Sequence, residues 1–267
     1  ENALENCDMA LELNPEAAST RYQRARILFE MESFDESMVE LERVLEINQF
    51  HEDALQLAGY IAGQQGDDDT SLEYYGQYLE LNPGNVQVRM RLAYELAREA
   101  GNPRAAMELI QGGLDVEPDN VDLLEQYGGF AFASALAAVR EAELDSSEAG
   151  ELPPEAEELY RQAIGAYEQV FEIKGEETPV GHLRNIIAAN IQLGNVEAAV
   201  DVGERVLETH SQEATLWSIY ADALNRSGRT DEAITALDRV KEINPAHPNV
   251  AMRQGNWLIT AGEMDRA

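Results

Sequence analysis

One set of residues recurs along nearly the whole chain at a spacing of about 34 positions. In the clearest copy, which runs from Ala214 to His247, large, small and turn-forming residues hold fixed places: Trp217, Tyr220, Ala221, Leu224, Ala233, Leu237 and Pro245. A period of this length is typical of a helix–turn–helix repeat, which buries its apolar face only by stacking on copies of itself. The sequence therefore predicts a stack of helices, and any activity must come from that stack.

Small residues occupy the place where the two helices of each predicted repeat cross, because a small side chain lets the backbones approach closely. These residues are Ala25, Gly59, Ala93, Gly128, Ala221 and Gly255. Glycine stands where the first helix should end, since it adopts the left-handed conformation without strain. The glycines at this place are Gly66, Gly101, Gly194, Gly228 and Gly262. Asn-Pro at 14–15, 82–83 and 244–245 then ends the second helix.

These places follow the pattern W-x2-L-G-x2-Y…A-x3-F…P, and the chain resembles the tetratricopeptide repeat family. The resemblance implies an all-α, right-handed superhelical solenoid of antiparallel helix pairs, with about 14 helices. We predict half repeats at 1–17 and 248–267 and six whole repeats between them: 18–51, 52–85, 86–120, 121–177, 180–213 and 214–247. Because both ends cut through a repeat, we expect a piece of a longer array.

The fourth repeat departs from the period, because its second-helix residues Ala163 and Val170 come about two dozen positions late. Residues 130–144 are rich in alanine and leucine, which favour helix, and Pro153-Pro154 can start the next helix. We predict an insertion at about 136–157 that forms an elongated helical hairpin, with apolar contacts across it from Leu136, Val139, Leu152 and Leu159. Its tip would be acidic, with Glu141, Glu143, Asp145, Glu148 and Glu151. A disordered acidic loop is the alternative.

The chain is strongly acidic, with 51 acidic against 19 basic residues and a net charge of −32 at pH 7. Such a surface repels phosphate backbones and anionic lipid, so we expect no nucleic acid partner. A well-solvated exterior is the simpler interpretation of this charge, and an acidic recognition patch is the other.

No segment of the sequence is suited to inserting into a membrane. The longest stretch without a charged residue, at 126–139, has fourteen residues, short of the roughly 20 apolar residues that a span requires. We expect a soluble chain without a signal peptide or transmembrane segment, and its compartment stays open. The single cysteine, Cys7, falls at a core place between Ala3 and Ala10, and an uncovered half repeat could self-associate there.

The family resemblance places the first helices on a concave groove, and helical spacing then selects the side chains that line it. From the first three whole repeats these are Tyr22, Arg26, Phe29, Gln56, Tyr60, Met90, Tyr94 and Arg98, and further along Phe132 and Arg184. Aromatic and arginine side chains are the usual anchors of protein interfaces. The alternative is that Tyr60 and Tyr94 only pack against the adjacent helix.

The sequence offers no constellation for chemistry, so we expect no enzyme, no catalytic residue, no cofactor and no metal site. The four histidines, His51, His182, His210 and His247, lack paired ligand spacing. Family members that grip a terminal carboxylate carry lysine and asparagine on successive first helices. Here those places hold Tyr22 and Arg26, Gln56 and Tyr60, or Met90 and Tyr94, so that role is not expected.

Two functions remain. The first is a protein-binding module that holds a partner's segment in the groove. The second is a structural scaffold of a larger assembly, which contacts partners through the convex face and the inserted hairpin. A weaker third possibility is an accessory domain of an enzyme or secretion component whose other parts lie outside this chain.

Overall fold

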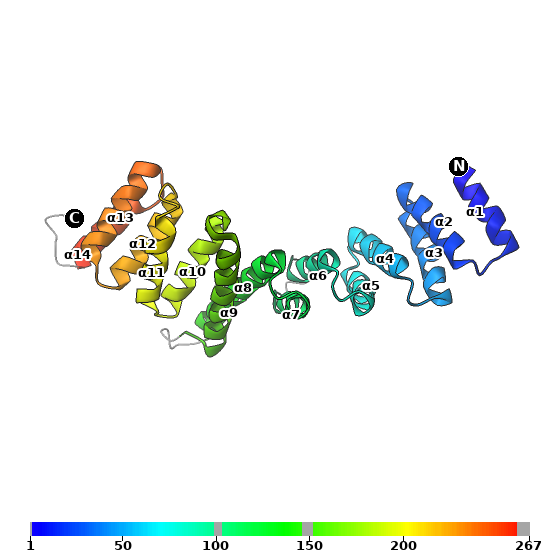
Figure 1. Cartoon of the computed structure of the whole chain (residues 1–267), viewed down its shortest axis with the longest axis horizontal. Coiled ribbons are helices and arrows are strands. Elements are labelled where there is room, and N and C mark those ends of the chain that lie inside the picture. The colour runs from blue at the N-terminus through cyan, green and yellow to red at the C-terminus, as the bar shows by residue number, and fades with distance from the viewer. Residues whose placement is uncertain (1, 99–102, 146–151, 261–267) are drawn as a thin grey trace. The chain divides into compact units, whose positions relative to one another are not determined.

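The structure, a computed structural model, describes residues 2–98, 103–145 and 152–260. Over these residues it consists of helices, turns and loops without a strand (Figure 1). Fourteen α-helices follow one another in the described ranges, which confirms the all-α fold class and its helix number. The glycine turns expected at Gly101 and Gly262 lie outside the described residues.

The chain divides into two compact units, Glu1–Pro118 and Asp119–Ala267, called here the N-terminal and C-terminal units. In the N-terminal unit α1 precedes three helix pairs, α2 with α3, α4 with α5 and α6 with α7. Their bounds are Asn2–Leu13, Ala18–Glu30, Phe34–Ile47, Glu52–Gln65, Asp68–Leu81, Val86–Arg98 and Pro103–Leu114. Successive helices lie side by side, so each pair covers the apolar face of the pair before it.

The C-terminal unit contains three further pairs, α8 with α9, α10 with α11 and α12 with α13, followed by α14. Their bounds are Val121–Asp145, Pro154–Lys174, Val180–Gln192, Val196–Leu207, Ala214–Arg226, Thr230–Ile243 and Val250–Thr260. A short 3₁₀ turn, Gly175–Glu177, follows α9. No described helix is both long enough and apolar enough to cross a bilayer.

The predicted small residues do lie at the helix crossings. Ala25, Ala93 and Ala221 are fully buried, and Gly59 and Gly128 are buried against tyrosines of the paired helix. A β-carbon added at Gly128 would lie 2.8 Å from the Tyr167 ring, and one at Gly59 3.0 Å from Tyr75. These glycines therefore make room for a large side chain from the second helix.

The fifth repeat reverses this arrangement. At the place of Gly59 it has the fully buried Ile187, and at the place of Tyr75 it has Gly203. The ring of Tyr220, from the following repeat, packs directly on Gly203. Small and large residues have thus exchanged helices, and the space is still filled.

In the described part of the chain, the first helices of four repeats are followed by a residue in the left-handed region. Gly66, Gly194 and Gly228 have φ of 78°, 74° and 82°, as the glycine pattern predicts. The same place in the first whole repeat holds Glu32, which adopts φ of 60°. A non-glycine residue there carries a strain of about 1 kcal/mol or more.

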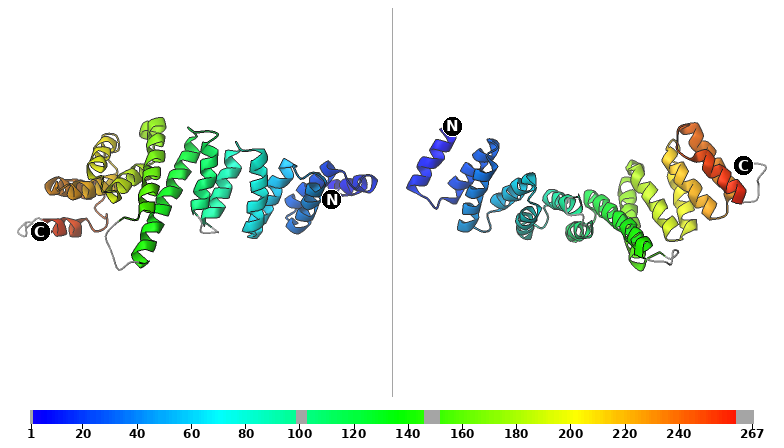
Figure 2. Two further views of the ribbon diagram at one scale, coloured as in Figure 1. Left: turned by 90° about the horizontal axis from the view of Figure 1, so that it is seen from below. Right: turned by 180° about the vertical axis from the view of Figure 1, so that it is seen from behind.

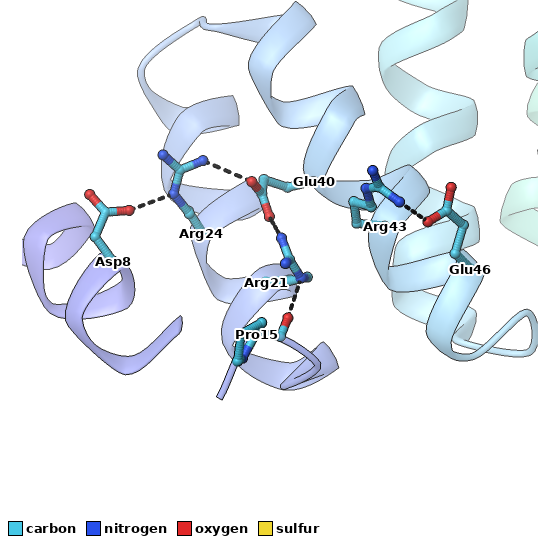
Figure 3. A network of polar contacts seen from close by, with 7 residues as sticks. All are labelled: Asp8, Pro15, Arg21, Arg24, Glu40, Arg43 and Glu46. Atoms are coloured by element: carbon cyan, nitrogen blue, oxygen red, sulfur yellow. Dashed lines mark hydrogen bonds and ion pairs between the residues drawn. The ribbon is translucent and has the colours of Figure 1, made fainter. Parts of the chain in front are cut away.

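A charged network holds α1 on the first whole repeat (Figure 3). The carboxylate of Glu40, on α3, accepts hydrogen bonds from Arg21 at 2.9 Å and from Arg24 at 3.0 Å, both on α2. Arg24 also donates to Asp8 of α1 at 2.9 Å, and Arg21 to the backbone oxygen of Pro15. Glu40 is nearly buried. The hydrogen bonds from the two arginines offset the free energy that burying its charge costs.

The half repeat at the start is only partly covered. Cys7 is a free thiol and is half-buried together with Ala10, whereas Ala3, predicted to share their core face, is exposed. Met9 and Leu13 on the same helix are largely exposed. Self-association through this helix stays a prediction.

The insertion in the fourth repeat forms a pair of long helices, α8 and α9, which pack along each other (Figure 2). Leu159 is buried, and Val139 and Leu152 are half-buried, as the hairpin prediction requires. The prediction for Leu136 is wrong, because this side chain is 45% exposed and the buried face of α8 is formed by Ala135 and Ala138 instead. Of the expected acidic tip, Glu141 is exposed, and the side chains of the other four residues, Glu143, Asp145, Glu148 and Glu151, lie outside the described part.

We expect Gly203→Ala to lower the free energy of unfolding by about 1–3 kcal/mol, because the new methyl group would overlap the Tyr220 ring. Gly165→Ala is the matched control: Gly165 also lies inside a helix, but nothing approaches its added β-carbon within 4 Å. That change should raise the free energy of unfolding by about 0.5–1 kcal/mol. Urea titration followed by circular dichroism measures both, and equal effects would contradict the packing argument.

We expect Glu32→Gly to raise the free energy of unfolding by about 0.5–1 kcal/mol, since glycine adopts the left-handed conformation without the strain. Glu32→Ala serves as the control, because it removes the charge but keeps the strain. Thermal melts of the two variants beside the parent measure the effect. A higher melting temperature in both variants would assign the effect to the lost charge and contradict the strain argument.

Candidate functional site

The N-terminal unit contains a cavity of about 660 Å³ on the face formed by the first helices α2, α4 and α6. Aromatic residues form much of its wall, and the lining residues are Tyr22, Phe29, Asp53, Gln56, Leu57, Tyr60, Tyr75, Gln87, Val88 and Arg91. We call this cavity the aromatic pocket. Its volume lies in the usual range for ligand sites, about 300–1,000 Å³.

The aromatic wall is held by ring contacts within the first whole repeat and by one contact to the next repeat. Phe29 meets Tyr60 edge-on, with ring centroids 5.5 Å apart, and Phe29 also packs on Phe34 of the paired helix. Tyr22 lies 5.0 Å from the ring of His51, whose own nitrogen Nδ1 accepts the backbone N–H of Ala54 and so caps α4. The rings are thus anchored from both sides before any ligand arrives.

Arg91 is the central cation of the pocket. Its guanidinium carbon lies 4.3 Å from the centroid of the Tyr60 ring and 5.8 Å from that of Tyr75. Its Nε donates to Glu95 at 3.0 Å, and Glu95 accepts a second hydrogen bond from the Ser71 hydroxyl at 2.9 Å. Both the charge and the orientation of Arg91 are therefore fixed by the protein itself.

Three polar side chains of the pocket face solvent without a partner in the described part of the chain. Gln56 and Gln87 carry amides that can both donate and accept hydrogen bonds, and Asp53 carries a negative charge. Burial, and next the nearby Asp53 carboxylate, raise the pKa of the Tyr22 hydroxyl. A pocket with apolar walls and a few polar groups can bury the apolar part of a ligand and fix its orientation.

Four of the predicted groove residues line the aromatic pocket: Tyr22, Phe29, Gln56 and Tyr60. The other predicted residues of this unit do not line it. Arg26 is exposed, with its guanidinium 4.0 Å from Glu30, and Tyr94 is 54% exposed. Met90 is half-buried away from the pocket, and the side chain of Arg98 is outside the described part.

Asp53, Gln87 and Arg91 also line the pocket, although they were not predicted from the sequence. Each lies three residues before a residue that was selected, Gln56, Met90 or Tyr94, and therefore on the same helix face one turn earlier. That spacing could have revealed them. Which of two adjacent faces looks into the pocket depends on helix rotation, which the period alone does not supply.

The two predicted groove residues of the C-terminal unit belong to other environments. Phe132 packs edge-on against Tyr160, with centroids 5.6 Å apart, inside the α8–α9 hairpin. Arg184 is exposed and donates to its neighbour Asn185 at 3.0 Å. Neither residue lines the aromatic pocket, and their part in a groove stays a prediction.

A polar cluster instead links α8, α9 and α10. Lys174 donates to Glu125 at 3.0 Å, and His182 stacks on Tyr167 with centroids 4.6 Å apart. The Nδ1 atom of His182 is buried without a hydrogen bond, 4.0 Å from Glu125. Burial lowers the pKa of His182 below its ordinary value, although Glu125 opposes this.

Comparison with known proteins identifies the repeats. Profiles described as tetratricopeptide repeat match residues 18–51, 52–85 and 190–255, together about half of the chain. A TPR repeat-containing protein of Rhizobium etli is 29% identical over 100 residues, which are 38% of this chain and 49% of that protein. The match thus spans about half the length of that relative.

Solved structures share the fold at low sequence identity. A crystal structure of MamA protein has a TM-score of 0.54 and 15% identity, over 73% of this chain and 92% of that one. The structure of Naa15/Naa10 bound to HypK-THB has a TM-score of 0.67 and 16% identity, over 96% of this chain and 36% of that one. At such identities the likeness concerns the fold alone.

Acidification should destabilise the protein through His182. Because its pKa is lowered in the folded state, the unfolded chain binds the proton more readily, and this stability contribution is present above about pH 6.5 and lost as pH falls below it. We expect His182→Gln to show a smaller loss of unfolding free energy between pH 7.5 and 5.5 than the parent. His247→Gln, which changes a histidine in a turn, is the control and should keep the parent's loss.

Proposed function

The chain belongs to the tetratricopeptide repeat family, and we propose that it binds an extended segment of a protein partner in the aromatic pocket. The observation that carries this proposal is the combination of anchored rings and free polar groups on the first helices. A partner's side chain can enter between rings that are already ordered, so little entropy is lost on binding. The free amides of Gln56 and Gln87 can bond to the partner's backbone.

The role of Arg91 in this function is to shape the pocket. Glu95 and Tyr60 already hold its guanidinium. The cation therefore packs on the Tyr60 ring and fixes the ring's orientation in the pocket wall. Proteins of known structure with this fold include a complex, Naa15/Naa10 bound to HypK-THB. For the present chain a protein partner is the proposal, in keeping with its family.

A scaffold function is the second candidate, and the α8–α9 hairpin favours it. Leu136 exposes 45% of its surface on a long helix, next to the exposed Ala133 and Ala137. An apolar patch of this kind can dock a further protein. The two candidates differ in which surface must be intact for partner capture.

Affinity capture from the source cells distinguishes them. A pocket variant with Tyr22→Ala, Gln56→Ala and Gln87→Ala should retain its partner at least about tenfold less, because truncated anchors lose contacts worth more than 1 kcal/mol each. Tyr94→Ala, which removes an exposed tyrosine outside the pocket, is the matched control and should change capture less than about twofold. Loss only with Leu136→Asp would instead establish the hairpin as the binding surface.

A further inference from the structure

We propose that Asp53 and Tyr22 form a subsite for a basic side chain, arginine or lysine, of the partner segment. This inference rests on the proposed function, because it names the chemistry that one end of the aromatic pocket selects. It follows from the balance of charges in the pocket and from the rings that remain available to a cation.

Each cation near the pocket has a carboxylate partner of its own. Arg91 bonds to Glu95 at 3.0 Å, and Arg26 lies 4.0 Å from Glu30. Asp53 lines the pocket and has no ion-pair partner among the described residues. The unbalanced charge of the lining is therefore negative, and a ligand that brings a positive charge would complete it.

The aromatic rings of the pocket also favour a positively charged ligand. Tyr60 already carries the Arg91 guanidinium, 4.3 Å from its centroid. Tyr22, on the neighbouring first helix, lies close enough to the Asp53 carboxylate for that charge to raise its pKa, an effect that the charge of Arg26 opposes. Among the described residues no cation stacks on the Tyr22 ring. A carboxylate beside an aromatic ring is a favourable environment for an ammonium or guanidinium group. Repulsion from Arg91 would keep the incoming cation at the Asp53 end of the pocket.

The rest of the lining suits the carbon stem of such a side chain. Leu57 and Val88 contribute apolar walls next to the tyrosines, and the stems of arginine and lysine pack on apolar surface while the charged head stays near water. Asp53 is exposed, so the head could pair with it without full desolvation. The net charge of −32 adds long-range attraction for a basic segment.

Selection of random heptapeptides displayed on phage tests the inference on the whole chain. The baits are the parent, Asp53→Asn and Asp122→Asn. Asp122 is the matched control: it holds the same place in the fourth repeat, exposed in the first turn of α8, so both variants lose one charge at a helix start. We expect arginine or lysine to be enriched at one position with the parent and with Asp122→Asn, and not with Asp53→Asn.

Fluorescence anisotropy then measures the affinity of a selected peptide and of the same peptide with arginine replaced by citrulline, which keeps the shape and removes the charge. The two affinities, compared between the parent and Asp53→Asn, give the coupling energy between the peptide's charge and Asp53. We expect the replacement to weaken binding about tenfold with the parent and less than about twofold with Asp53→Asn.

Equal losses with both baits, or selected peptides without a basic position, would overturn the subsite and leave the proposed function standing. Failure to select any peptide would overturn both. General attraction to the acidic chain would enrich basic peptides equally with all three baits, and that result also contradicts the inference.

Discussion

The close approach of the two helices within each repeat is the constraint on which the structure depends. Two helices can pack at the crossing only if a small residue on one faces a larger residue on the other. Gly59 with Tyr75 and Gly128 with Tyr167 satisfy this condition within one repeat, whereas Gly203 receives the ring of Tyr220 from the following repeat. A glycine on either helix of a pair can thus make room for a tyrosine ring, and the space is filled in each case.

The crossings also create the aromatic pocket. Because successive repeats stack on one another, the first helices α2, α4 and α6 contribute side chains to the same pocket. Tyr60 can then reach Phe29 in the preceding repeat and receive Arg91 from the following one. The pocket is thus a product of stacking, since no single repeat contains its wall.

Ion pairs between arginines and carboxylates join neighbouring helices of this acidic chain. Where carboxylates are abundant, one arginine can pair with two of them, as Arg24 does with Glu40 of its own repeat and with Asp8 of α1, and the second pair holds α1 on the first whole repeat (Figure 3). A carboxylate that is left over beside an aromatic wall, such as Asp53, is then the more informative feature. In a chain with a net charge of −32, specificity depends on where a negative charge is placed and not on how many there are.

The sequence by itself determined the helices, their pairing and the long hairpin, because the period, the small residues and the glycine turns are local signals that act within one repeat. It also named Tyr22, Phe29, Gln56 and Tyr60 as residues of one face. Only the tertiary structure decided that Arg91 and Asp53 belong to that face, that Tyr94 stays outside it and that Leu136 is exposed. The reason is physical: a helix offers several faces at the same period, and the rotation that selects one is set by packing against neighbours far along the chain.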